Sequence, residues 1–218
     1  MDMNLKNQVI RGIGILLVAW TGIVAAEQDG VDGVDGLGKG EIAISDSTFS
    51  CIRDMTKVRG FYVDNLNGNI DATLAVANSA TGGKYPEGSV VQLVPGEVMV
   101  KHGRGFSPAT MDWEFFELDV SDTGSEIRKR GFVDVINRFG NNCFGCHIQA
   151  KPEWDLICET GHGCETIPIT AEVIELIQIT DPRCDDNEDL STGEYFELLK
   201  LKIKVSIGTS IGTVKGWL

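Results

Sequence analysis

Five consecutive residues, Cys143, Phe144, Gly145, Cys146 and His147, form the pattern Cys-x-x-Cys-His. This pattern is the attachment signature of a c-type haem. Two thiols three positions apart can add to the two vinyl groups on one edge of a porphyrin. The next residue, His147, can then give an imidazole nitrogen to the iron. The sequence therefore predicts one covalently bound haem c with His147 as its proximal ligand.

Two other kinds of site use a cysteine pair at this spacing. Half of a zinc site is one of them, and it needs a second ligand pair, for which His162 and Cys164 are the nearby candidates. A thioredoxin-like redox pair is the other, and it does not require a histidine. The adjacent His147, together with the export signal described next, favours haem.

The first 26 residues have the pattern of a secretion signal. Lys6 and Arg11 are basic, an apolar run extends from 12 to 24, and Val24-Ala25-Ala26 offers small residues for cleavage. The run is short for a bilayer span, which needs about 20 residues, so we expect cleavage rather than a retained membrane anchor. Haem c is attached after export in Gram-negative bacteria, so the signal and the haem motif together predict a periplasmic protein.

The chain is acidic. Removal of residues 1–26 takes away two basic residues and one acidic residue, which leaves 17 basic against 31 acidic residues and a net charge of −14. A charge of this sign disfavours binding to nucleic acid or to an anionic membrane surface. It favours a basic partner, for example a basic redox protein, although solubility alone would explain the same composition.

Composition divides the rest of the chain into three segments. Residues 27–44 are rich in Gly and Asp and predict a flexible linker. Residues 45–151 contain the haem motif and predict a haem domain of the α+β class, dominated by an antiparallel sheet with a few helices. Residues 152–218 predict a mainly helical, cysteine-containing C-terminal extension.

Periodicity predicts the individual elements. Alternation between 97 and 102 places Val98 and Val100 on one face of a strand and Met99 and Lys101 on the other. Short turns between the strands predict an antiparallel meander. The expected strands are 61–63, 89–94, 97–102 and 113–120. Helices are expected at 45–58, at 170–180 with Thr170 as N-cap, and at 194–204. Residues 131–139 are expected to form a strand or a short helix, and the segment 71–80 fits either type.

Three segments in order carry a resemblance to a known family: Tyr85-Pro-Glu-Gly88-Ser-Val-Val, then Asp112-Trp-Glu-Phe-Phe116, then Cys-x-x-Cys-His. Together they resemble the cytochrome P-460 family, which includes the cytochromes c′-beta. The resemblance covers about half of the chain, from Thr48 to Lys151. It implies a small periplasmic protein with an antiparallel sheet, one haem c near the end of the domain and a homodimeric state.

The resemblance implies two chemistries. The P-460 enzymes oxidise hydroxylamine and carry a strand lysine bonded to the haem, whereas the c′-beta members bind nitric oxide or related gases. The strand expected to carry that lysine is Ser89–Val94, which contains none; Lys84 precedes it and Lys101 follows one strand later. We therefore expect binding or redox handling of nitric oxide at a five-coordinate haem. A hydroxylamine-oxidising enzyme and a periplasmic electron carrier are the alternatives.

Several residues are candidates for the open side of the iron. Phe115 and Phe116 point to opposite faces of their strand, so one can line the haem while the other packs in the core. Glu114 corresponds to a possible catalytic glutamate by the resemblance. The side chains that could reach the iron as a sixth ligand are Met99, Lys101, His102, Met111 and His162.

Four cysteines remain outside the haem motif: Cys51, Cys158, Cys164 and Cys184. An even number in an oxidising compartment predicts disulfides, and four thiols allow three pairings. A Cys158–Cys164 or a Cys164–Cys184 bridge would hold the C-terminal segment. The acidic run 185–189 could bind calcium, but a solvated loop is expected.

Overall fold

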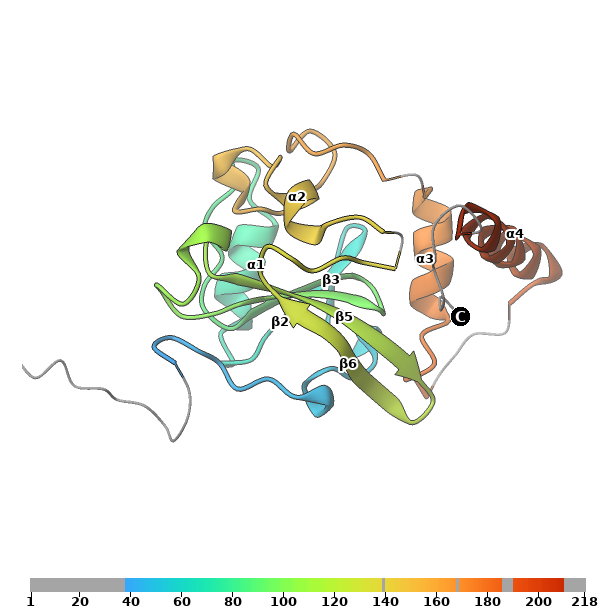
Figure 1. Cartoon of the computed structure of the whole chain (residues 1–218), viewed down its shortest axis with the longest axis horizontal. Helices are drawn as coiled ribbons and strands as arrows, with labels where there is room; N and C mark the ends of the chain where they lie inside the picture. The colour runs from blue at the N-terminus through green and yellow to red at the C-terminus, as the bar shows by residue number, and fades with distance from the viewer. Residues whose placement is uncertain (1–37, 139, 168, 186–189, 210–218) are drawn as a thin grey trace, which may run out of the picture. The chain divides into compact units, whose positions relative to one another are not determined.

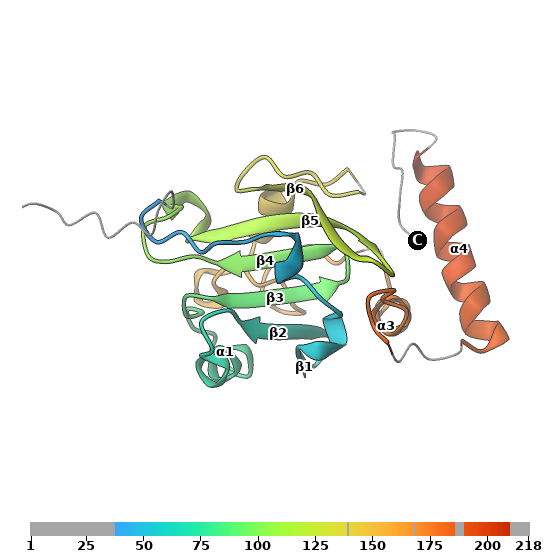
Figure 2. The ribbon, with the colours of Figure 1, turned by 90° about the horizontal axis from the view of Figure 1, so that it is seen from below.

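A six-stranded antiparallel sheet forms the centre of the computed structural model, which describes residues 38–209 except 139, 168 and 186–189. The strands follow one another in the sheet in chain order, as in a meander (Figure 2). The predicted α+β class with a dominant sheet is thereby confirmed. The strands are β1 (Thr56–Val58), β2 (Phe61–Asn65), β3 (Ser89–Val94), β4 (Glu97–Lys101), β5 (Trp113–Ser121) and β6 (Gly124–Gly131).

The α-helices lie above the sheet and beyond one of its ends in Figure 1. No described helix is long and apolar enough to cross a membrane. The α-helices are α1 (Ile70–Ala77), α2 (Cys143–His147), α3 (Ala171–Ile179) and α4 (Thr192–Thr209), and the 3-10 helices are η1 (Asp46–Thr48), η2 (Ile52–Asp54), η3 (Pro108–Thr110) and η4 (Pro152–Trp154). The expected signal (1–26), most of the expected linker (27–44) and most of the acidic run (185–189) lie outside the described residues.

Alternating side chains give the sheet two apolar faces. The α2 face, named for the helix that covers it, carries Val63, Val91, Met99 and Phe115. The N-terminal face carries Val90, Val98, Val100, Phe116 and Leu118, which pack against Phe49. In Figure 2 the N-terminal segment crosses in front of the sheet and α2 lies behind it. The predicted alternation of Val98 and Val100 against Met99 is confirmed.

The helix expected over residues 45–58 is wrong. The segment instead forms η1, η2 and β1, because long-range contacts hold it extended along the sheet. Phe49 packs on Phe116 with 5.2 Å between ring centroids, and the backbone N–H of Ile52 donates to the buried Asp181 carboxylate over 2.9 Å. Tertiary contacts of this kind override a weak helical spacing. Strand β6 was not predicted, and of the expected element at 131–139 only Gly131 is in a strand. The described residues 132–138 form neither strand nor helix, and Ile136 makes an isolated bridge to Asn142.

The segment that begins at residue 152 belongs to the same compact unit as the sheet. Leu156 and Ile157 lie in the core on the α2 face. The side-chain amide of Gln178 donates to the carbonyls of Gly60 and Leu93, which ties α3 to the sheet. The expected Thr170 cap is confirmed, since its hydroxyl accepts from the Val173 N–H.

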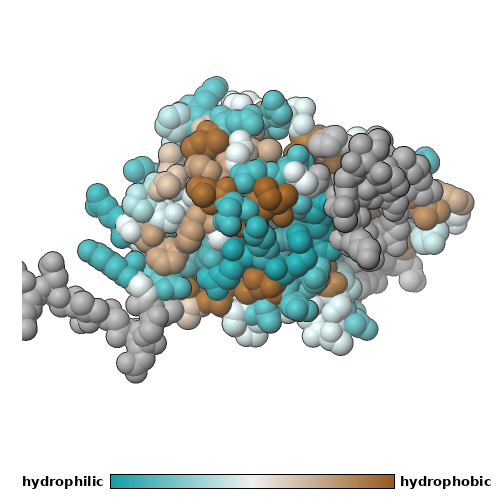
Figure 3. Space-filling view, viewed as in Figure 1, coloured by the Kyte–Doolittle hydropathy of each residue, from teal (hydrophilic) through white to brown (hydrophobic). Residues whose placement is uncertain are grey.

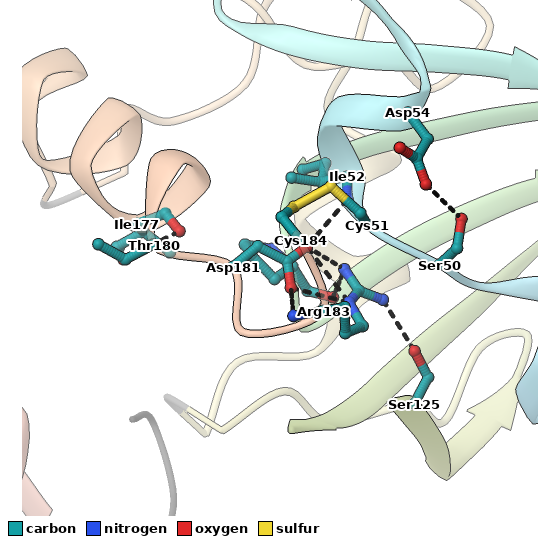
Figure 4. Close-up of a disulfide and its surroundings, with 11 residues drawn as sticks. Ser50, Cys51, Ile52, Asp54, Ser125, Ile177, Thr180, Asp181, Arg183 and Cys184 are labelled. Atoms are coloured by element: carbon teal, nitrogen blue, oxygen red, sulfur yellow. Dashed lines mark hydrogen bonds and ion pairs between the residues drawn. A yellow bond between two sulfur atoms is a disulfide. The ribbon is translucent and has the colours of Figure 1, made fainter. Parts of the chain in front are cut away.

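Two disulfides complete this packing. The expected Cys158–Cys164 bridge is confirmed. The alternative Cys164–Cys184 pairing is wrong, because Cys184 pairs with Cys51, which precedes it by 133 residues. Figure 4 shows this second disulfide beside the buried Asp181–Arg183 ion pair, from which Arg183 also donates to Ser125. The N-terminal segment is thus bonded covalently to the chain that follows α3.

Candidate haem-attachment site

The two motif cysteines lie on one turn of helix and keep free thiols, whereas the other four cysteines form disulfides. Asn142 caps this helix: its side-chain oxygen accepts from the Gly145 N–H over 2.6 Å and its amide donates to the Val133 carbonyl. Cys143 is half-buried against the α2 face and Cys146 is exposed. Both thiols are therefore held at fixed positions and are available for covalent bonds.

The environment of Cys143 argues against a thioredoxin-like redox pair. Burial raises the pKa of the Cys143 thiol to about 12, and the nearby Glu97 and Glu117 carboxylates add to this effect. A dithiol redox site needs the opposite, a cysteine whose pKa is lowered so that the thiolate forms. A zinc site is also disfavoured, because Cys164 is bonded to Cys158 and His162 stacks on Trp154 with 3.7 Å between ring centroids.

The imidazole of His147 is oriented by the backbone. Its Nδ1 lies 2.7 Å from the Leu156 carbonyl oxygen, and since a carbonyl only accepts, Nδ1 carries the proton. Nε2 is then left with its lone pair. Burial lowers the pKa of His147, although the Leu156 carbonyl acts in the opposite direction, so the neutral form is favoured. A neutral imidazole whose second nitrogen donates to a carbonyl is the usual state of a metal-ligating histidine.

The surroundings are compatible with a large apolar cofactor. Three exposed apolar side chains flank the motif, namely Val133, Ile136 and Ile148. Figure 3 shows brown patches on the face of the molecule that carries α2. The rings of Phe115 and His147 lie 5.4 Å apart by their centroids, so the imidazole faces the apolar side chains of the sheet. With two free thiols and an oriented imidazole, the residue set fits a covalently held haem.

The strand β5 separates the other predicted site residues. Phe115 lies on the α2 face, where its ring is 6.4 Å from that of Phe144, whereas Phe116 lies on the N-terminal face. Glu114 also points to the N-terminal face, where its carboxylate accepts from His102 over 2.8 Å and from Arg130 over 2.6 Å. The structure therefore brings Phe115 to the motif and places Phe116 and Glu114 across the sheet from it.

Two of the five candidate sixth ligands share the α2 face with the motif. Met99 pairs with Phe115 across β4 and β5 and is buried. The Lys101 ammonium group contacts the Asp155 carboxylate over 2.8 Å. His102 lies on the N-terminal face, where its Nδ1 accepts from the Ile42 N–H. The other two are Met111, which is 36% exposed, and His162, whose Nδ1 bonds to the Ile157 carbonyl.

A pair of glutamates near Cys143 escaped the sequence analysis. Glu97 and Glu117 are direct partners in the β4–β5 register, and Arg138 binds Glu117 over 2.9 Å. Glu97 Oε1 and Glu117 Oε2 are buried without a hydrogen-bond partner in the described structure. Burial raises the pKa of Glu97 to about 7, and the charge of Glu117 adds to this effect. The sequence could have revealed them, because the alternation of β4 and β5 places two glutamates among the mostly apolar residues that face α2.

Glu97 should make the stability of the protein depend on pH. The pKa of Glu97 is about 7 in the folded protein and 4.5 in the unfolded chain. The protonated side chain therefore contributes its full stabilisation below pH 4.5, and this contribution is lost as the pH rises through 7. We expect the free energy of unfolding to fall by about 3 kcal/mol more in the wild type than in Glu97→Gln over this range. Urea denaturation at several pH values measures it, with the exposed Glu126→Gln as control. Equal slopes for wild type and Glu97→Gln would contradict the assignment.

Comparisons of the chain with protein-family models, with curated proteins and with solved structures find no match. The functional interpretation therefore depends on the motif and on the geometry around it.

Proposed function

We propose that this chain is an exported mono-haem c-type cytochrome that binds small nitrogen-oxide ligands, in particular nitric oxide. One observation carries the proposal. The two thiols outside the disulfides are those of the Cys-x-x-Cys-His motif, and the adjacent His147 is held with Nε2 free. Cys143 and Cys146 would hold the porphyrin, and His147 would be the proximal ligand. The bound haem would supply an iron atom that binds small ligands and exchanges one electron.

The apolar side chains on the α2 face favour binding of a small ligand over a large one. Phe115, Met99 and Val91 form an apolar surface there, and Phe115 is 2% exposed. The side chains of Phe115 and Val91 cannot ligate iron, and the apolar surface as a whole excludes water; of the three, Met99 alone carries an atom that could ligate iron. Glu114, the candidate general base, lies on the other face and is bonded to His102 and Arg130, so no proton acceptor for hydroxylamine comes from this residue.

The position of the lysines also disfavours the hydroxylamine-oxidising alternative. Strand β3 has Gln92 and Leu93 where a crosslinking lysine was expected, and the Gln92 amide donates to the Pro95 carbonyl. Lys101 lies on the α2 face, but its ammonium group is engaged by Asp155 and by the Met111 carbonyl. If the protein is nonetheless an enzyme, it would be a haem-dependent oxidoreductase acting on hydroxylamine or nitric oxide.

An electron carrier is the second candidate function, because one observation favours it. The thioether of Met99 is buried on the same face as the motif, directly across from Phe115. A Met–His pair of axial ligands is typical of cytochromes that transfer electrons. The net charge of −14 after removal of residues 1–26 would then suit a basic redox partner.

The two disulfides support the proposed export, since such bonds persist in oxidising compartments and are rare in the cytosol. The proposed location is the periplasm after removal of residues 1–26. A homodimer is proposed from the family resemblance, and sedimentation velocity of the purified protein would test it.

The coordination state of the iron separates these functions. We expect the reduced protein to show a five-coordinate, high-spin absorption spectrum that changes on addition of nitric oxide. Met99→Leu should leave the spectrum unchanged, as should the control Met111→Leu. A six-coordinate, low-spin spectrum that Met99→Leu converts to high spin would establish the electron-carrier function instead. Mass spectrometry that finds a haem peptide crosslinked to Lys84 or Lys101 would establish the hydroxylamine-oxidising enzyme instead.

A further inference from the structure

Two pairs of consecutive residues adopt the left-handed backbone conformation that non-glycine residues rarely occupy. Met111 and Asp112 have φ of 52° and 67°, and Asp155 and Leu156 have φ of 49° and 67°. Such conformations cost free energy and persist only where the surroundings enforce them. Leucine gains nothing from this conformation, whereas aspartate tolerates it. Contacts with the surrounding residues must therefore hold the Asp155–Leu156 turn in this conformation.

The side chain of Lys101 joins the two turns. Its ammonium group donates to the Met111 carbonyl over 2.6 Å and to both oxygens of the Asp155 carboxylate, over 2.9 Å and 2.8 Å. The same carboxylate accepts from the Tyr85 N–H over 2.9 Å. The Lys101 and Asp155 side chains are 9% and 1% exposed, and the ammonium group lies 4.9 Å from the centre of the Trp113 ring. Asp155 is thus held by Lys101 at the end of β4 and by the backbone of Tyr85 in the loop before β3.

The fixed turn carries the group that orients the imidazole. The Leu156 carbonyl follows Asp155 by one residue and accepts the Nδ1–H of His147 over 2.7 Å. Its direction is set by the backbone angles of Asp155 and Leu156, which the Lys101–Asp155 pair holds in place. A continuous path of bonds therefore leads from a buried ion pair to the proposed proximal ligand.

We propose that Asp155, held by Lys101, is a positioning residue that sets the tautomer and the electron donation of His147 through the Leu156 carbonyl. The inference rests on the proposed haem attachment and deepens it. A hydrogen bond from Nδ1–H makes Nε2 a stronger electron donor, which stabilises ferric iron relative to ferrous iron. Loss of the bond has the opposite effect.

The test uses three variants of the full chain and one matched control. Asp155→Asn removes the charge but retains the shape and the tolerance for a left-handed backbone. Lys101→Met removes the ammonium group and keeps a long apolar stem over Trp113. The double variant shows whether Lys101 acts only through Asp155. The control is Asp181→Asn, which breaks an equally buried aspartate–cation pair and a bond to a backbone N–H away from α2.

In the haem-loaded protein, Asp155→Asn should raise the reduction potential and lower the frequency of the iron–histidine stretch in the Raman spectrum of the reduced form. Lys101→Met should shift both in the same direction, and the double variant should match Asp155→Asn. Asp181→Asn should leave both at their wild-type values even where it lowers the melting temperature. Equal shifts in Asp155→Asn and Asp181→Asn would overturn the proposal, because they would reflect a general loss of packing.

A second measurement does not need the haem. In the full chain produced without haem, the ¹⁵N chemical shifts of His147 should report the Nδ1–H tautomer, and Asp155→Asn should move the population towards Nε2–H. If His147 responds in this way although no haem is ever attached, the positioning stands and the haem assignment fails. If haem is attached but Asp155→Asn changes neither the His147 tautomer in the haem-free chain nor the reduction potential of the haem-loaded protein, the positioning inference fails alone.

Discussion

The double variant Cys143→Ala/Cys146→Ala is expected to lose all haem on extraction with acidified acetone, whereas the wild type keeps its haem with the protein. Thioether bonds from these two residues are the proposed covalent link, and His147 alone holds haem only by coordination, which acid breaks. Each single variant should keep at most a weakened attachment through the remaining thiol. The fold should survive, because Cys146 is exposed and Cys143 is only half-buried.

The matched control for this experiment is Cys158→Ala/Cys164→Ala, which removes two cysteines of the same region and leaves all five motif residues unchanged. It should retain covalent haem at the wild-type level. Full retention of haem in the Cys143→Ala/Cys146→Ala variant would refute the assignment of the motif. Equal loss in both double variants would mean that the effect comes from folding rather than from attachment.

Removal of the Cys51–Cys184 disulfide should have the second largest effect. This bond joins residues 133 positions apart, and in the chain-entropy model a loop of this length stabilises the folded state by about 5 kcal/mol. That is comparable to the whole stability of many domains of this size. We expect Cys51→Ala/Cys184→Ala to lower the free energy of unfolding by about 4 kcal/mol, measured with urea under non-reducing conditions.

The short Cys158–Cys164 bridge is the comparison, since its cysteines are six residues apart. The same model gives about 2 kcal/mol for such a loop. Equal destabilisation by loss of either bridge would show that local packing, and not loop length, determines the effect. The Asp181–Arg183 pair beside Cys184 would then be the first alternative source of the larger stability (Figure 4).

Local patterns were sufficient for much of the sheet. The alternation around Met99 predicted which side chains of β4 share a face, and the turns at Pro86-Glu-Gly88 and Pro95-Gly96 marked the ends of β3. Thr170 marked the start of α3, because its hydroxyl accepts a hydrogen bond from the N–H of Val173, three residues further along the chain. Each of these signals depends only on residues close together in the chain.

The errors concern contacts that connect distant parts of the chain. The helix expected over 45–58 is replaced by two short 3-10 helices and a strand, because Cys51 and Ile52 are bonded to Cys184 and Asp181. Glu114 was placed near the haem by resemblance, but the pleat of β5 turns it to the face where His102 and Arg130 lie. The role of Leu156 as partner of His147 has no sequence signal, because a backbone carbonyl is present in every residue.

The pairing of Cys51 with Cys184 has a consequence for biogenesis. Synthesis proceeds from the N-terminus, so Cys51 emerges first and its partner emerges only after Cys143, Cys146, Cys158 and Cys164 have all passed. During that interval an oxidising environment can join Cys51 to any of these four thiols, including the two that we propose bind haem. Under the proposed export and haem attachment, correct maturation would need a thiol isomerase, or early capping of Cys143 and Cys146 by haem, before Cys184 emerges.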